Sequence, residues 1–119
     1  MNTAENNKLI AEFLGGYQYD NHDDFITFDE TNNIFSNDTI SLKNLKFHTD
    51  WNWLMEVVEK IESLGYSTEL KFIAGLGNTM FFISGGAEVP LNRRIFKTKI
   101  EAVYNACVTF IEWYNEQPK

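Results

Sequence analysis

A histidine and an aspartate stand two positions apart, at His48 and Asp50 in the run FHTDWNW. A histidine oriented by a carboxylate can act as a general base, so this pair could begin an active site. The alternative is a helix start, because a short oxygen-bearing side chain such as Thr49 or Asp50 before a periodic apolar run is typical of an N-cap. Capping explains every residue type here except His48, and no nearby serine or second histidine completes a triad. We therefore predict no catalytic residues, and keep His48 with Asp50 or Asp24 as the enzymatic alternative.

The segment DNHDDF, residues 20–25, could hold a metal ion through carboxylate and imidazole ligands. The candidate ligands are Asp20, His22, Asp23 and Asp24. The spacing does not fit a calcium loop, because the sixth position is not glycine and Thr31 stands where a bidentate glutamate is needed. We therefore predict no metal site and no cofactor, and interpret the segment as a solvated acidic turn. The glycines of GLGN and SGGAEVP do not lead into a helix, so they predict turns rather than a phosphate loop.

The charge of the chain is unevenly distributed. Its net charge is −7, and no Lys or Arg occurs between Leu9 and Leu42. Phosphates repel such a protein, so we predict no direct DNA binding and expect a protein partner with a basic surface. The predicted partner-binding residues are Asp20, Asp23, Asp24, Asp29 and Glu30. The alternative site is the basic run of Arg93, Arg94, Lys97 and Lys99, which would meet an acidic partner or RNA.

Several features of the sequence bear on its compartment. Cys107 is the single cysteine, so no internal disulfide forms and a reducing compartment is expected. The N-terminus lacks a basic region followed by an apolar stretch, and no apolar run approaches the roughly 20 residues that span a bilayer. We expect a cytoplasmic protein without a membrane partner. Cys107 stands on the apolar face of a predicted helix, which indicates a core residue rather than a nucleophile.

Apolar residues at helical spacing predict three helices, over about residues 4–14, 51–64 and 99–116. Thr3 is expected to cap the first, and Thr98 with Glu101 forms a capping box at the third. Strand patterns occur at DFITFD, NNIFS, STELKFIAG and TMFFISG, with LKFH as a possible fifth. The 119 residues predict one domain, spanning 1–119, of the α+β class. We expect three helices and a mainly antiparallel sheet of four to five strands, in the order α-β-β-(β)-α-β-β-α.

Three stretches resemble the phage ABA sandwich domain family, a group of small proteins carried by phages and prophages. They are NKLIAEFLGG, FHTDWNWLMEVVEKIESLGY and TKIEAVYNACVTFIEWYNE. The resemblance covers roughly residues 7–19, 47–66 and 98–116. It implies an α/β/α sandwich and supplies no catalytic residues, because the shared motifs are caps and core positions.

A phage protein acts in the cytoplasm of the bacterial host cell. Small acidic phage proteins without catalytic motifs include many inhibitors of host defence, so the resemblance implies a non-enzymatic counter-defence role. The specific expectation is an anti-CRISPR inhibitor that binds a host RNA-guided nuclease, or its guide-RNA complex, through its charged surface. The alternative is a phage structural or housekeeping accessory protein of the same fold, acting as a subunit of a larger assembly.

Overall fold

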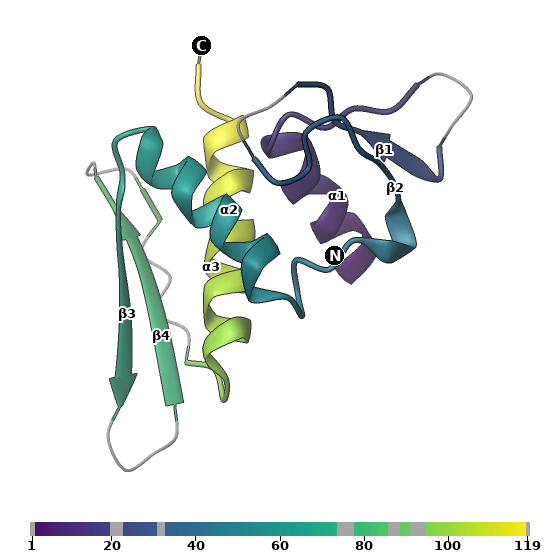
Figure 1. Cartoon of the computed structure of the whole chain (residues 1–119). Coiled ribbons are helices and arrows are strands. Elements are labelled where there is room, and N and C mark those ends of the chain that lie inside the picture. The colour runs from purple at the N-terminus through teal and green to yellow at the C-terminus, as the bar shows by residue number, and fades with distance from the viewer. Residues whose placement is uncertain are drawn as a thin grey trace.

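The computed structural model describes residues 2–19, 23–30, 33–73, 78–85, 89–90 and 95–118. Its helices are α1 (Thr3–Phe13), α2 (Trp51–Ser63) and α3 (Lys99–Asn115), with a short 3-10 helix η1 (Leu42–Asn44) before α2. Its strands are β1 (Phe25–Thr27), β2 (Thr39–Ser41), β3 (Ser67–Ile73) and β4 (Asn78–Ser84). The predicted α+β class, the three helices and their order among the strands are confirmed (Figure 1).

The strands form two antiparallel sheets of two strands each, β1 with β2 and β3 with β4. Their number is at the lower end of the predicted range, but they do not join into the one sheet that was expected. In Figure 1 the three helices lie between the two hairpins. The segment LKFH is not a strand, because the carbonyl of Lys46 accepts hydrogen bonds from the N–H groups of Thr49 and Asp50 in a turn. Residues 33–37, which include most of NNIFS, also form a turn.

Each helix begins at a side chain that accepts a backbone hydrogen bond. Asn2 caps α1 instead of the predicted Thr3, which lies inside the first turn. Asp50 caps α2 by accepting from an N–H two residues further on, at 2.9 Å. Thr98 caps α3 by accepting from the N–H of Glu101 at 3.2 Å, and the Glu101 carboxylate in turn accepts from the Thr98 hydroxyl. Capping therefore accounts for the polar residues at these three starts, as each such cap stabilises a helix by about 1 kcal/mol.

The helix α3 is the centre of the core. Its buried residues are Ala102, Val103, Tyr104, Ala106, Cys107, Val108, Phe110 and Ile111. It packs against β4 on one side and against α1 and α2 on the other (Figure 1). The side chain of Cys107 is fully buried, and burial raises the pKa of its thiol above the ordinary value. This placement agrees with the prediction of a core residue, since a thiol held in the neutral form is a poor nucleophile.

Aromatic rings anchor the β1–β2 hairpin to α2. Phe28 and Phe35 stack with ring centroids 5.2 Å apart. Phe35 also contacts Phe47 at 5.6 Å and Trp53 at 4.7 Å. Trp53 thus packs on the loop between β1 and β2, whereas Trp51 is 39% exposed. This cluster holds in place a hairpin whose strands are only three residues long.

Candidate functional site

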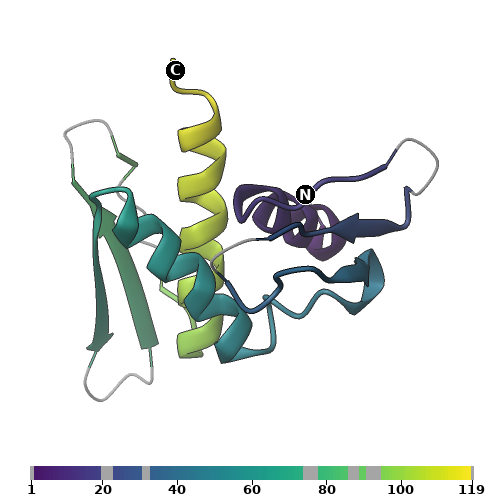
Figure 2. The same cartoon turned by 45° about the horizontal axis from the view of Figure 1, so that its top comes forward.

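Apart from Glu5 and Glu12 on α1, the acidic residues described between residues 1 and 40 lie on the β1–β2 hairpin and the turns at its two ends. Asp23 and Asp24 precede β1, Asp29 and Glu30 follow it, and all four side chains are exposed. Asp38 is also exposed and precedes β2. It lies beside Asp29, because the N–H of Asn37, the residue before it, donates a hydrogen bond to the Asp29 carbonyl. The structure therefore arranges these carboxylates as a strip along one hairpin, with Asp24 and Asp29 up to about 16 Å apart. Figure 2 shows this hairpin, in blue, beside α1 and on the side of the helices away from β3 and β4.

Exposed aromatic rings stand within this strip. The backbones of Tyr17 and Thr27 exchange two hydrogen bonds, of 3.0 and 2.8 Å, so the segment before β1 runs beside that strand. Tyr19 is 53% exposed and Phe25 is 43% exposed. Together with Thr27 and Thr39 they line a mostly apolar hollow of about 380 Å³. Large rings that remain accessible beside charged side chains are the residues that most often anchor a protein partner.

Hydrogen bonds tie one carboxylate of the strip to these rings. The hydroxyl of Tyr17 donates to the Asp29 carboxylate at 2.9 Å and lies 3.0 Å from the hydroxyl of Tyr19. The two tyrosine rings pack edge to face with centroids 5.2 Å apart. The hydrogen bonds with Tyr19 and Asp29 raise the pKa of Tyr17 above its ordinary value. Tyr17 therefore remains a neutral donor and fixes the position of Asp29.

Phe25 also lines a second hollow, of about 690 Å³. Its lining residues are Ala4, Asp24, Phe25, Ser41, Leu42 and Lys43. Phe25 therefore lines both hollows, and the second also has the exposed carboxylate of Asp24 and the amine of Lys43 in its lining. We call the region formed by Tyr17, Tyr19, Phe25 and the surrounding acidic residues the acidic–aromatic surface. An apolar centre with a charged rim is the usual anatomy of a protein–protein interface. The sequence analysis found its acids and missed its rings.

The alternative basic site lies elsewhere in the molecule. Lys97 and Lys99 are exposed at the start of α3, on the side of the helices that carries the β3–β4 hairpin. Three of the predicted residues, Asp20, Arg93 and Arg94, lie outside the residues that the structure describes. The structure thus separates the described acidic and basic candidates, so each can be altered without touching the other.

His48 is positioned by an amide rather than by a carboxylate. Its Nδ1 lies 3.0 Å from Nδ2 of Asn7, and the same Nδ2 donates to the carbonyl of Leu45 at 3.1 Å. Because the amide nitrogen is the donor, Nδ1 accepts and the neutral ring carries its proton on Nε2. The Asp50 carboxylate instead caps α2, and Asp24 is on the β1–β2 hairpin. The geometry of a histidine oriented by either aspartate is therefore not formed.

The same Asn7 is a buried polar residue that the sequence analysis missed. It is 2% exposed, and its Oδ1 accepts a hydrogen bond of 2.9 Å from the hydroxyl of Tyr104. Burial raises the pKa of Tyr104 to about 12, so this hydroxyl stays a donor at neutral pH. Asn7 therefore joins α1, the turn before α2 and α3 through one side chain. The available signal was its position three and four residues before the apolar Ile10 and Ala11, on the buried face of a helix.

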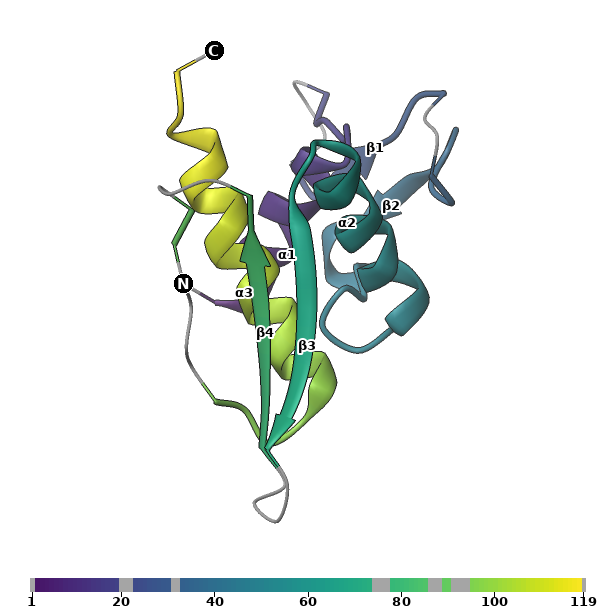
Figure 3. The ribbon, with the colours of Figure 1, turned by 90° about the vertical axis from the view of Figure 1, so that its left-hand side faces the viewer.

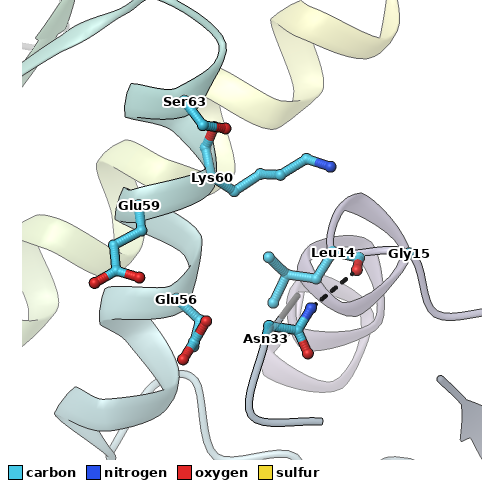
Figure 4. A pocket seen from close by; sticks show the side chains of 7 residues that line it. All are labelled: Leu14, Gly15, Asn33, Glu56, Glu59, Lys60 and Ser63. Atoms are coloured by element: carbon cyan, nitrogen blue, oxygen red, sulfur yellow. Dashed lines mark hydrogen bonds between the residues drawn. The ribbon is translucent and has the colours of Figure 1, made fainter. Parts of the chain in front are cut away.

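A further hollow of about 500 Å³ lies between the end of α1 and α2 (Figure 4). Glu56 and Glu59 line it, and burial, followed by the charge of Glu59, raises the pKa of Glu56. Ser63 donates to the carbonyl of Lys60 at 2.6 Å, which occupies its hydroxyl. Neither histidine nor cysteine occurs among the described residues of its lining. Two carboxylates and an amine can bind a polar molecule here, but this arrangement offers no activated nucleophile.

In the described part of the chain, no group of three or more His, Cys, Asp or Glu side chains is arranged to hold a metal ion. None of the helices described is both long and apolar enough to cross a membrane. The predicted metal candidates at residues 20 and 22 lie outside the described ranges.

Comparison with known proteins returns no match to a family model, a curated protein or a solved structure. The assignment of a function therefore depends on the acidic–aromatic surface itself and on the sequence resemblance given above.

Proposed function

We propose that this chain is a phage-encoded, non-enzymatic counter-defence protein that binds a host RNA-guided nuclease or its guide-RNA complex. The observation that carries the proposal is the acidic–aromatic surface, where exposed rings stand among carboxylates on the β1–β2 hairpin and the segment before it. The resemblance of residues 7–19, 47–66 and 98–116 to phage ABA sandwich proteins supports the phage setting. Action on such a nuclease requires the protein to work in the cytoplasm of the bacterial host cell.

The chemistry of the surface favours a protein partner with positive charge. A segment without Lys or Arg between residues 9 and 42 repels nucleic-acid phosphates and attracts basic side chains. Tyr19 and Phe25 supply apolar area with little rotamer freedom to lose, which is what an interface anchor requires. The carboxylates then raise the association rate and select basic partners, while the rings slow dissociation.

An RNA-guided nuclease has the complementary surface. It holds its guide–target heteroduplex in a channel lined by Lys and Arg, which recognises backbone shape and charge. A strip of carboxylates can occupy such a channel in place of phosphates. The channel is exposed before the nuclease captures its target, so an acidic protein that binds there prevents target loading.

Charge reversal with a matched control tests the proposal. Asp23→Lys with Asp24→Lys changes the acidic–aromatic surface, and Glu112→Lys with Glu116→Lys makes the same net charge change at exposed positions on α3 and its C-cap. We expect the first pair to weaken nuclease binding by about tenfold or more and to reduce its salt dependence. The pair on α3 and its C-cap should leave nuclease binding and its salt dependence unchanged. The melting temperature of each double variant should stay close to that of the parent protein.

The readouts are retention of the nuclease from lysates of hosts that carry CRISPR systems, and phage survival under CRISPR targeting. Retention of no nuclease together with unchanged phage survival would refute the counter-defence role. If the variant with Asp23→Lys and Asp24→Lys retains the nuclease and protects phage as well as the parent protein, the acidic–aromatic surface is not the binding site. Co-migration of the protein with virions in infected lysates would instead support the role of a structural or accessory subunit.

A further inference from the structure

The β3–β4 hairpin has one backbone edge that no strand covers in the part of the chain that the structure describes. The strand β4 pairs with β3 on one side, and on the other Thr79 exchanges hydrogen bonds of 2.8 and 2.9 Å with Phe96. Among the described strands, β3 pairs with β4 alone. Figure 3 shows β3 with β4 on one side and, on the other, no strand but the helix α2 beside the first part of β3. An open edge of seven residues offers N–H and C=O groups to another strand.

The bridge between Thr79 and Phe96 determines which groups of β3 point outward. In an antiparallel sheet the N–H and C=O of one residue point to the same side, and the side alternates along the strand. Both groups of Thr79 face Phe96, so Thr79 and its cross-strand neighbour Phe72 form a non-hydrogen-bonded pair within the hairpin. Following the alternation along the unbroken register, the outward groups of β3 belong to Thr68, Leu70 and Phe72.

We propose that β3 pairs antiparallel with β3 of a second copy of this chain about a two-fold axis at Leu70, which joins two hairpins into one four-stranded sheet. Leu70 is the central residue of β3, so this register pairs the strand over its whole length. Leu70 lies opposite Leu70 of the second copy, and Thr68 lies opposite Phe72 in both directions. Each of these opposed pairs exchanges two backbone hydrogen bonds, so every outward group of Thr68, Leu70 and Phe72 gains a partner.

The side chains of β3 are complementary to themselves in this register. Glu69 faces Lys71 of the second copy, and Lys71 faces Glu69, on the exposed side of the sheet. Directly opposed unlike charges stabilise an antiparallel pair, and like charges destabilise it. On the other side of the sheet, Leu70 is 36% exposed in the single chain and would be covered by Leu70 of the second copy. This self-complementarity selects a second copy as the occupant of the edge.

The size of the sheet is compatible with this dimer. An isolated sheet of two strands is marginal in water, and packing against a helix or pairing with further strands stabilises it; this hairpin already packs against α3 and would gain two strands. The apolar face already exists, because Phe81 and Ile83 of β4 are 6% and 5% exposed against α3. Pairing of two hairpins would extend this face.

Charge swapping at Glu69 and Lys71 tests the dimer, with the dissociation constant measured by sedimentation equilibrium from low to several hundred micromolar. Glu69→Lys or Lys71→Glu alone places like charges opposite each other twice, which should raise the dissociation constant by about tenfold or more. An equimolar mixture of the two variants restores both unlike pairs, so a heterodimer should form. The double variant with both changes should dimerise like the parent protein.

Glu112→Lys, at an exposed position of α3, is the matched control and should leave the dissociation constant unchanged. A parent protein that stays monomeric throughout the concentration range overturns the proposal. A dimer that both single variants leave intact also overturns it, since that dimer uses another surface. Because the readout is self-association alone, failure here is distinct from failure of nuclease binding by the acidic–aromatic surface.

Discussion

Replacement of Asn7 by alanine removes a side chain that connects α1, the turn before α2 and α3. Two buried groups lose their partner: the carbonyl of Leu45 and the hydroxyl of Tyr104, whose residues are 2% and 7% exposed. Each unsatisfied buried group costs about 1–3 kcal/mol. His48 is exposed and can turn its Nδ1 to water, so it adds nothing to this cost. Alanine regains about 0.5 kcal/mol of helix propensity.

The free energy of unfolding should therefore fall by about 2–5 kcal/mol in Asn7→Ala. For a chain of 119 residues this corresponds to a drop in melting temperature of about 8–20 °C. Urea denaturation and calorimetry at neutral pH measure both quantities. Asn115→Ala, the same chemical change at an exposed position of α3, is the control and should be neutral or slightly stabilising.

A double-mutant cycle shows whether the cost comes from the Asn7–Tyr104 hydrogen bond. Tyr104→Phe alone leaves Oδ1 of Asn7 unpaired and should cost about 1–3 kcal/mol. The double variant removes both ends, so its cost should be smaller than the sum of the single costs by about 0.5–3 kcal/mol. Strict additivity, or a loss below about 1 kcal/mol for Asn7→Ala, would mean that water already satisfies these groups.

Two further predictions concern α2. Trp53→Ala should lower the free energy of unfolding by about 3–5 kcal/mol, because the Trp53 ring packs against Phe35 and Phe47. Asp50→Ala removes only the helix cap and should lower it by about 1 kcal/mol. Equal small decreases of the melting temperature in both variants would show that the ring contributes little. Burial raises the folded-state pKa of Glu56 above its ordinary value of 4.5, so its stabilising contribution is complete below that pH and is lost as pH rises through the folded pKa. Glu56→Gln should therefore raise the melting temperature at pH 7 by a small amount, and this gain should vanish at about pH 4. The control Glu116→Gln, at an exposed site, should leave the melting temperature unchanged at both pH values.

The helices could be predicted from the sequence because their apolar spacing and caps are local signals. The structure places α2 at Trp51–Ser63 and α3 at Lys99–Asn115, each within one residue of the predicted limits. The division into two sheets could not be predicted, since alternation of apolar and polar residues specifies the face of a strand and not its partner. LKFH shows the same limit: its buried Phe47 sits in a turn, held there by contact with Phe35 and Trp53.

The candidate surface was predictable in part. Its charges are visible as a run of acids without Lys or Arg, but charge alone did not identify the rings that give the surface its apolar centre. Tyr17 and Tyr19 are two residues apart and point to one face only because the segment bridges to Thr27, a contact between residues ten apart in sequence. Asn7 and Tyr104 are 97 residues apart, so their hydrogen bond is a property of the fold.

The two proposed interfaces lie at opposite ends of the molecule, and this separation has a consequence for binding strength. Figure 1 shows the helices between the β1–β2 and β3–β4 hairpins. A dimer joined through β3 would carry its two acidic–aromatic surfaces on its outer sides, where each is free to engage a basic surface. Two linked sites bind a repeated or two-part partner more tightly than either site alone, without any new contact. Glu69→Lys, which acts on self-association only, should therefore weaken inhibition of a divalent partner while leaving the affinity of a single acidic–aromatic surface unchanged.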